Sequence, residues 1–238
     1  MPQFLIPPGK KPDDRVAVSP EESRHATKVL RLERGARVRL TDGAGGLFTG
    51  RVETITPKQT IVWIEARLPV PEPKAKVILA QGLLKGDKME FVIQKAAELG
   101  AFAVLPFTSS RTVSDWKGDS KKLQRWGKIA EAASKQCGRA AHLEILEPLA
   151  FTKALDVAAD AKIAFWEESP RPAKDFLRGQ QARSLLVLVG PEGGLSKMET
   201  DEAVRGGFTL LSMGSLILRA ETAAISALSV IQYELDNF

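Results

Sequence analysis

The sequence predicts an α/β protein with a mostly parallel sheet covered by helices on both faces, preceded by a small β-barrel or sandwich. After residue 72, short apolar stretches alternate with helical ones, which is typical of parallel strands connected by helices. Within residues 37–68, apolar and polar residues alternate around an Asp42-Gly43 turn, which indicates paired strands. A proline-rich stretch interrupts both patterns. We therefore expect two domains, residues 1–71 and 72–238.

A single helix interrupts the strands of the first domain. Ser19, Pro20 and Glu22 supply an N-cap, a first-turn proline and the acid of a capping box, which predicts a helix over residues 22–32. Basic residues at i, i+4 and i+7 share one face of this helix. They are Arg24, Lys28 and Arg31. Residues 1–70 hold 12 Lys and Arg against 8 Asp and Glu, which is most of the net charge of +5. This face predicts RNA binding, with a merely solvated basic surface as the alternative.

The second domain shows strands and helices in alternation. The expected strands are 76–82, 102–108, 143–148, 161–167, 184–190 and 208–214. The expected helices are 86–100, 120–137, one that starts near Lys197, and 220–235. This order favours a mostly parallel sheet, because antiparallel neighbours need no connecting helix.

The helix over 120–137 combines an apolar stripe with a basic surface. The stripe is expected to pack inward and consists of Leu123, Trp126, Ala130, Ala133 and Cys137. Eight Lys and Arg lie between residues 111 and 139, which indicates contact with RNA phosphates or, alternatively, only a solvated face. The candidates for phosphate contact are Arg111, Arg125 and Arg139.

A strand, a glycine turn and a helix follow one another after residue 184. A short apolar run over 185–189 predicts a buried strand. Ser196 and Glu199 stand at capping-box spacing, so we expect a helix from about Lys197 to Gly206. This order places the turn at the carboxyl edge of a sheet, where α/β folds bind their ligands.

The turn itself, from Gly190 to Gly194, does not match the usual phosphate-binding loops. P-loop spacing would require a glycine where Leu195 stands, and the dinucleotide fingerprint would require one at Glu192. A carboxylate at this place repels a pyrophosphate, but it can accept hydrogen bonds from ribose hydroxyls or lie near a cation. The turn therefore favours a nucleoside-like or positively charged ligand, with a plain structural turn as the alternative.

A second glycine turn repeats this layout. An apolar stretch to Met213 predicts a strand, Gly214-Ser215 predicts a turn, and a helix is expected from about Ala220. If the two turns follow neighbouring strands, they form opposite walls of one pocket. Residues 216–218 would then offer an apolar surface to a flat base.

Composition argues against several other classes of protein. A single cysteine excludes an intramolecular disulfide, and with only two histidines beside it no zinc site is expected. No apolar run approaches the ~20 residues of a membrane span, and the amino terminus lacks the apolar stretch of a signal peptide. We expect a cytoplasmic protein without a metal, in which Cys137 is a small core residue.

Four stretches together resemble the bacterial SPOUT-class RNA methyltransferases of the RsmE type. They are "HATKVLR", "KGDKMEFVIQKAAELG", "LVGPEGGLS" and "SMGSLILRAETAAISAL", and the resemblance covers nearly the whole chain. It implies a PUA-like RNA-binding barrel, a C-terminal trefoil knot and a dimer. It also implies methylation of uridine N3 in 16S ribosomal RNA of the small subunit, with S-adenosylmethionine as the donor. The largely apolar last helix suits a homodimer interface or, alternatively, a central core helix.

The resemblance further implies which residues bind S-adenosylmethionine. One wall comes from the first glycine turn and the strand before it, and the rest comes from the second turn and the helix after it. The residues are Leu188, Gly190, Glu192, Gly193, Met213, Gly214, Leu216, Leu218 and Thr222. Glu192 fits as an acceptor for the ribose or for the loop itself.

Two charged residues are candidates for the chemistry. Uracil N3 attacks a methyl group once its proton leaves, and a cation beside the base stabilises the resulting anion. Arg219 is the candidate cation, with an ion pair to Glu221 or a contact at the helix end as the alternatives. Glu221 could accept the proton or orient Arg219. The other functions to weigh are methylation of a different RNA base and a noncatalytic RNA-binding role in ribosome assembly.

Overall fold

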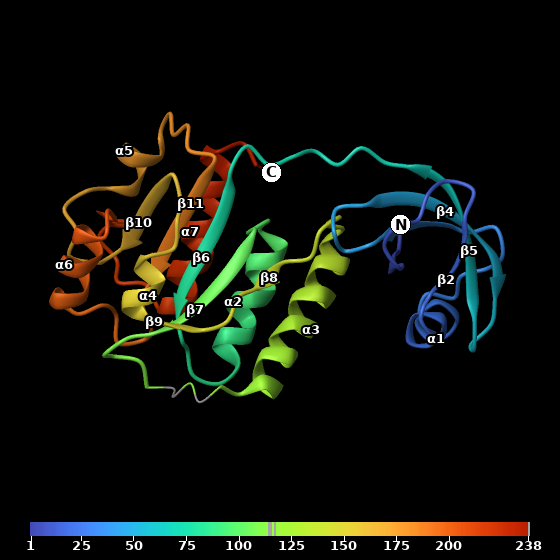
Figure 1. Ribbon diagram of the computed structural model, residues 1–238, viewed down its shortest axis with the longest axis horizontal. Coiled ribbons are helices and arrows are strands. Elements are labelled where there is room, and N and C mark those ends of the chain that lie inside the picture. Colours follow the sequence, from blue (N-terminus) through green and yellow to red (C-terminus); the bar gives the residue numbers. More distant parts are fainter. Residues whose placement is uncertain (114–115, 117, 238) are drawn as a thin grey trace. The chain divides into compact units, whose positions relative to one another are not determined.

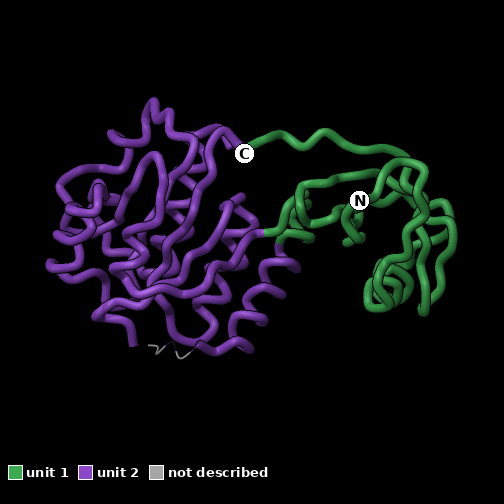
Figure 2. Tube along the Cα trace, in the orientation of Figure 1, with its two compact units in different colours: residues 1–72, 134–142 green, residues 73–133, 143–238 purple. Residues whose placement is uncertain are grey.

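The chain divides into two compact units in the computed structural model, which describes residues 1–113, 116 and 118–237 (Figures 1 and 2). The first unit contains residues 1–72 and 134–142, and the second contains residues 73–133 and those from 143 onward. None of the helices in the described part of the chain has the length and apolar character needed to span a bilayer.

The first unit is a curved five-stranded sheet around its own apolar core (Figure 1). Its strands, in spatial order, are β1 (Gln3–Leu5), β3 (Arg37–Thr41), β4 (Leu47–Ile55), β5 (Thr60–Arg67) and β2 (Arg15–Ala17). All neighbours are antiparallel except β1 and β3. The expected turn at Asp42-Gly43 is confirmed, because Asp42 Oδ1 accepts hydrogen bonds from the backbone of Ala44 and Gly46 and so closes the hairpin.

Helix α1 (Pro20–Lys28) is shorter than the sequence suggested. Its N-cap is confirmed, since Ser19 Oγ accepts a hydrogen bond from the Glu22 amide at 3.1 Å. The Glu22 carboxylate does not complete a capping box, because it accepts from the Leu5 amide and pairs with Lys135 instead. The expected extension to residue 32 was wrong. The backbone of Arg31 has a left-handed φ of 49°, so Arg31 lies beyond the helix and not on its basic face.

Residues 134–142 belong to the first unit although the residues on both sides belong to the second. Thr41 Oγ1 donates to the Ala140 carbonyl at 2.6 Å, and the His142 amide donates to the Gly43 carbonyl at 2.9 Å. Gln3 adds a side-chain hydrogen bond to the Arg139 carbonyl. These contacts join residues about a hundred positions apart, so no local sequence pattern predicts them.

The second unit is an all-parallel sheet with helices between its strands, as expected (Figure 1). The strands are β6 (Lys76–Gly82), β7 (Ala103–Thr108), β8 (Glu144–Ile145), β9 (Leu149–Ala150), β10 (Ala161–Phe165), β11 (Ser184–Val189) and β12 (Thr209–Leu211). The helices are α2 (Asp87–Glu98), α3 (Ser120–Cys137), α4 (Phe151–Leu155), α5 (Ala173–Leu177), α6 (Lys197–Arg205) and α7 (Ala220–Glu234). The last residues of α3 belong to the first unit.

Both faces of this sheet are buried, which explains the continuous apolar strands. In β11, Leu185 and Val187 point into a core formed with α2, α3 and α7, while Leu186 and Leu188 point into a second core with α4 and α6. The inward stripe of α3 is confirmed at Trp126, which is fully buried. It was wrong for Cys137, which is exposed at the end of the helix.

The strand order corrects one expectation about the site. The sheet runs β12-β10-β11-β6-β7-β8, so β10 lies between β11 and β12, and the two glycine turns do not follow neighbouring strands. The end of β10 is therefore placed between the two turns. The trefoil knot that the resemblance implies stays a prediction.

Candidate active site

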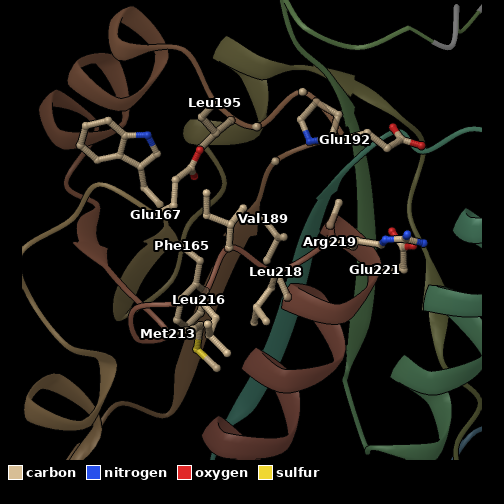
Figure 3. Close-up of a pocket in the computed structure, with 18 of the residues that line it drawn as sticks. Phe165, Glu167, Val189, Glu192, Leu195, Met213, Leu216, Leu218, Arg219 and Glu221 are labelled. Atoms are coloured by element: carbon tan, nitrogen blue, oxygen red, sulfur yellow. The ribbon is translucent and has the colours of Figure 1, made fainter.

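A cavity of about 310 Å³ lies in the second unit where β10, β11 and β12 end (Figure 3). Its walls are residues 165–167, residues 189–195, and most of the stretch 213–223, with Lys88 added from α2. Both glycine turns thus face one cavity, as the sequence predicted, although a third loop separates them. This is the carboxyl edge of the sheet, where ligands of open α/β folds bind.

The first glycine turn is held against its neighbours by a buried side-chain hydrogen bond and by close backbone packing. The buried Gln81 side chain donates from Nε2 to the Gly190 carbonyl at 3.1 Å. Gly82 lies so close to Pro191 that a Cβ there would clash with the Pro191 ring and with the backbone of Gly190. Gly194 has a φ of 67°, which favours glycine, and its amide donates to the Pro191 carbonyl. The turn is therefore shaped before any ligand arrives.

The helix that follows this turn begins with the expected capping box. Ser196 Oγ accepts from the Glu199 amide, while the Glu199 carboxylate accepts from the Ser196 amide at 2.8 Å. Glu199 also accepts from the Ser110 amide at 2.8 Å, which ties the loop after β7 to the start of α6. Burial raises the pKa of Glu199, but the hydrogen bonds from Ser196 and Ser110 outweigh it and hold the pKa below its ordinary value.

Arg111, in the same loop after β7, links that loop to the glycine turn. Its Nη1 donates to the Gly193 carbonyl at 3.0 Å and to the Leu195 carbonyl at 3.4 Å. A Cβ at Gly193 would lie 3.1 Å from the Arg111 Cβ, so a larger residue there would push against Arg111 by a few tenths of an ångström. Arg111, a candidate RNA contact in the sequence, is thus engaged with the backbone of the cavity wall.

The second turn supplies the apolar part of the cavity. Gly214 has a φ of 118°, and the chain after it carries Leu216 and Ile217 with 79% and 85% of their surface exposed. In Figure 3 the side chains of Phe165, Met213 and Leu216 gather at one end of the cavity. Such an apolar surface suits a flat ring system better than a phosphate.

The other end of the cavity is charged (Figure 3). Glu192 Oε1 accepts from the Lys85 amide at 2.9 Å, which confirms a loop-ordering contact for this carboxylate. Lys88 Nζ lies 3.7 Å from Glu192 Oε1 and 3.7 Å from Glu221 Oε2. Within the described part of the chain Glu221 pairs with Lys88, and no ion pair joins it to Arg219, which is exposed at the start of α7.

The structure brings together most of the residues predicted for the cofactor. Those that line the cavity are Gly190, Glu192, Gly193, Met213, Gly214, Leu216 and Leu218, with Arg219 and Glu221 beside them. Leu188 is instead fully buried in the core under α4 and α6, and Thr222 is exposed and does not line the cavity.

The predicted RNA contacts have different surroundings. Arg24 and Lys28 are exposed on α1, and Arg31 is exposed beyond its end. Arg125 Nη2 forms a 2.8 Å ion pair with Glu90 of the neighbouring helix α2. Arg139 lies in the first unit and donates from Nε to the Ala141 carbonyl, and burial lowers the pKa of its guanidinium.

Sequence reasoning missed several residues of the cavity wall, among them the residues around the end of β10 and one lysine. Phe165 is the last residue of β10, Trp166 and Glu167 follow it, and Lys88 lies in the first turn of α2. The sequence does carry a signal for the first three, since an aromatic pair and two acids stand at the end of an apolar strand. Lys88 belongs to "KGDKMEFVIQKAAELG", one of the four stretches that carry the family resemblance. Only the fold places it beside Glu192 and Glu221.

A parallel sheet with glycine loops and a cavity at its carboxyl edge defines a ligand-binding α/β protein. Residues 71–232 match the RNA methyltransferase domain family, and residues 18–64 match the RNA methyltransferase PUA domain. The chain is 31% identical over 234 residues to the ribosomal RNA small subunit methyltransferase E of Bacillus subtilis, covering 92% of this chain and 90% of that protein. The chain belongs to the family of ribosomal RNA small subunit methyltransferase E.

Solved structures that resemble the whole chain include two with S-adenosylmethionine bound. A methyltransferase of Legionella pneumophila in complex with S-adenosylmethionine is 33% identical with a TM-score of 0.86, over 97% of this chain and 96% of that one. The ribosomal RNA small subunit methyltransferase E of Neisseria gonorrhoeae, bound to S-adenosylmethionine, is 28% identical with a TM-score of 0.89, over 98% and 97%. These matches confirm the expected fold class, a parallel α/β unit with a PUA-like domain.

Proposed function

We propose that this protein transfers a methyl group from S-adenosylmethionine to N3 of a uridine in 16S ribosomal RNA of the small subunit. The observation that carries the proposal is the single cavity to which both glycine turns contribute, apolar at one end and charged at the other. Family membership supports the RNA substrate, and the N3 position follows from the resemblance of the sequence. With ribosomal RNA as the substrate, we place the enzyme in the cytoplasm.

The net charge of the side chains that line the cavity is opposite to the net charge of S-adenosylmethionine. Among the described residues that line it, Lys88 and Arg219 stand against Glu167, Glu192 and Glu221, which leaves one net negative charge. S-adenosylmethionine carries a sulfonium, an ammonium and a carboxylate, and so one net positive charge. The ligand therefore balances the cavity, whereas a dinucleotide would add negative charge to it.

The shape of the cavity supports the same assignment. Leu216 and Leu218 offer an apolar surface for the adenine ring, and Glu192 offers an acceptor for the ribose hydroxyls. Gly190, Gly193 and Gly214 allow the backbone to approach the ligand closely. We further assign Met213 to the wall, and Leu188 and Thr222 to its support. When bound, S-adenosylmethionine supplies a methyl group activated by the positive sulfur.

The chain's own residues hold and deprotonate the base. In this proposal Glu221 accepts the N3 proton, and Arg219 at the cavity rim stabilises the negative charge that develops on the uracil. Both residues line the cavity, Arg219 as the N-cap of α7 and Glu221 in its first turn. No step requires a metal ion.

Residues 1–71 act in this proposal as the RNA-binding domain and residues 72–238 as the methyltransferase domain. The RNA contacts are Arg24, Lys28, Arg31, Arg111, Arg125 and Arg139. We also propose a homodimer, because α7 exposes Val230 and Tyr233 on the side that its own unit does not cover.

The test is methylation of small ribosomal subunits that lack this modification, with a labelled methyl donor. We expect one labelled nucleotide in 16S ribosomal RNA, and mass spectrometry should place the methyl on uridine N3. Label on another base would instead support a different RNA target. Calorimetry with S-adenosylmethionine distinguishes a methyltransferase from a noncatalytic RNA-binding assembly factor. A pure assembly factor would not bind the methyl donor and would show no heat of binding.

A further inference from the structure

Lys88 lies between two carboxylates of the cavity and takes no part in the chemical step proposed above. It stands in the first turn of α2, and its ammonium is 3.7 Å from Glu192 Oε1 and 3.7 Å from Glu221 Oε2. Its side chain is 40% exposed, so the ammonium remains accessible from the cavity. Neither ion pair is as short as a hydrogen bond, which leaves donors on Lys88 for a ligand.

Glu221 complements Lys88, because it offers a ligand an unused hydrogen-bond acceptor. Its side chain is only 15% exposed, and Oε2 is buried without a hydrogen-bond partner among the described residues. A buried carboxylate oxygen without a donor is costly, so such an atom in a ligand cavity indicates a hydrogen that the ligand brings. The same oxygen is the one that faces Lys88.

We infer that Lys88 and Glu221 together read one edge of the target uracil, with Lys88 donating to O4 and Glu221 accepting from N3–H. This inference rests on the proposed function and adds Lys88 as a catalytic residue. A donor and an acceptor 3.7 Å apart can contact adjacent groups of one pyrimidine edge. Cytosine presents an amino group in place of O4 and no hydrogen on N3, so both contacts become repulsive.

The pair also supplies the charge changes that the reaction requires. Uracil N3 gives its proton to Glu221 Oε2 and its electron pair to the methyl carbon. The electron pair of the broken carbon–sulfur bond stays on sulfur, which becomes neutral. Negative charge that develops on O4 during this step is stabilised by the Lys88 ammonium, which keeps its own protons.

Arg219 does not replace Lys88 in this role. Arg219 is exposed at the cap position of α7, and within the described residues it has no ion pair with Glu221. Lys88 is the cation that lies beside the buried oxygen. Arg219 remains available for the other carbonyl of the base or for the RNA backbone.

The experiment compares Lys88→Met, Lys88→Arg and Glu221→Gln with the control Lys153→Met. Lys153 is exposed on α4, outside the cavity, and its substitution removes the same charge. We expect kcat on small subunits to fall about 100-fold in Lys88→Met, to recover partly in Lys88→Arg, and to be unchanged in Lys153→Met. The double variant Lys88→Met with Glu221→Gln should be no slower than Glu221→Gln alone, because the two groups act as a unit.

Two further readouts separate this role from a structural one. Calorimetry should show that Lys88→Met binds S-adenosylmethionine within about threefold of the wild type, which also shows that the variant folds. Subunits rebuilt with 5-fluorouridine, whose N3 proton is more acidic, should reduce the loss in Lys88→Met from about 100-fold to about 10-fold. A merely structural residue would cause the same loss with both substrates.

The outcomes distinguish this inference from the proposed function. If the wild type methylates uridine N3 but Lys88→Met behaves like Lys153→Met, only the role of Lys88 is overturned. If the whole loss in Lys88→Met appears in the affinity for S-adenosylmethionine, Lys88 belongs to the cofactor site and the inference also fails. If the wild type leaves uridine N3 unmodified, both proposals fall.

Discussion

Gly82→Ala is the sharpest test of how the cavity is built, because it changes one atom behind the first glycine turn. A Cβ at this position would lie 2.6 Å from Pro191 Cδ and 2.9 Å from the carbonyl carbon of Gly190. Ordinary contact between carbon atoms needs about 3.5 Å, so the turn has to move by roughly 1 Å. The neighbours are ring and backbone atoms, and no flexible side chain can yield in their place.

The expected losses follow from this displacement. Inserting a methyl group into packed structure costs about 1–3 kcal/mol of stability, which urea unfolding measures. The same displacement of a ligand-binding turn weakens binding of S-adenosylmethionine by about 10- to 100-fold, since each tenfold corresponds to about 1.4 kcal/mol. Calorimetry measures the affinity at a temperature where the variant is fully folded.

Gly127→Ala is the matched control. Gly127 lies inside α3, and a Cβ there meets no atom within 4 Å. This variant should gain up to about 1 kcal/mol in stability, because alanine favours the helix over glycine, and should bind the cofactor as the wild type does. Wild-type affinity and stability in Gly82→Ala would refute the view that the strand β6 fixes the shape of the turn.

Three other predictions follow from the same structure. The lowered pKa of Glu199 means that its carboxylate stabilises the fold at neutral pH, and that this stabilisation is lost as the pH falls through the folded-state pKa. Glu199→Gln should therefore lower the free energy of unfolding by about 1–3 kcal/mol at pH 7 and leave it unchanged in acid. Urea unfolding at several pH values measures this difference. Arg111→Ala should weaken S-adenosylmethionine binding about fivefold through the loss of its contacts to the turn, and a change in RNA affinity alone would contradict this. Removing both Arg24 and Lys28 should lower the salt dependence of RNA binding by about two units and leave cofactor affinity unchanged, as filter binding at a series of salt concentrations will test.

The parts of the fold that depend on neighbours in sequence were predictable. Helix α6 begins at Lys197 and ends before Gly206 because Ser196 and Glu199 cap one end and the glycine stops the other. The strand β11 is equally clear, since the five consecutive residues 185–189, with both faces covered, must be apolar. Local hydrogen bonds and burial are encoded over a few residues, and a single sequence displays them directly.

The parts that depend on distant pairing were not predictable. The order of strands puts β10 between the two glycine turns, so Phe165 and Glu167 line the cavity although the sequence did not predict them there. Helices α4 and α5 have five residues each, too few to show a period. Arg31 lies outside α1 because its backbone adopts a left-handed conformation. An arginine in the sequence does not predict such a conformation, as a glycine would.

The two walls of the cavity differ in how they can contribute to binding. The first turn is fixed from three directions: by Gln81 and Gly82 of β6, by Arg111 after β7, and through Glu199 at the start of α6. A wall ordered in advance loses little entropy when a ligand arrives, so it contributes orientation. The second turn instead leaves Leu216 and Ile217 mostly exposed, and covering one such side chain is worth about 1.5–3 kcal/mol. Orientation therefore comes from the rigid wall, and much of the affinity comes from the apolar area that the ligand covers on the other.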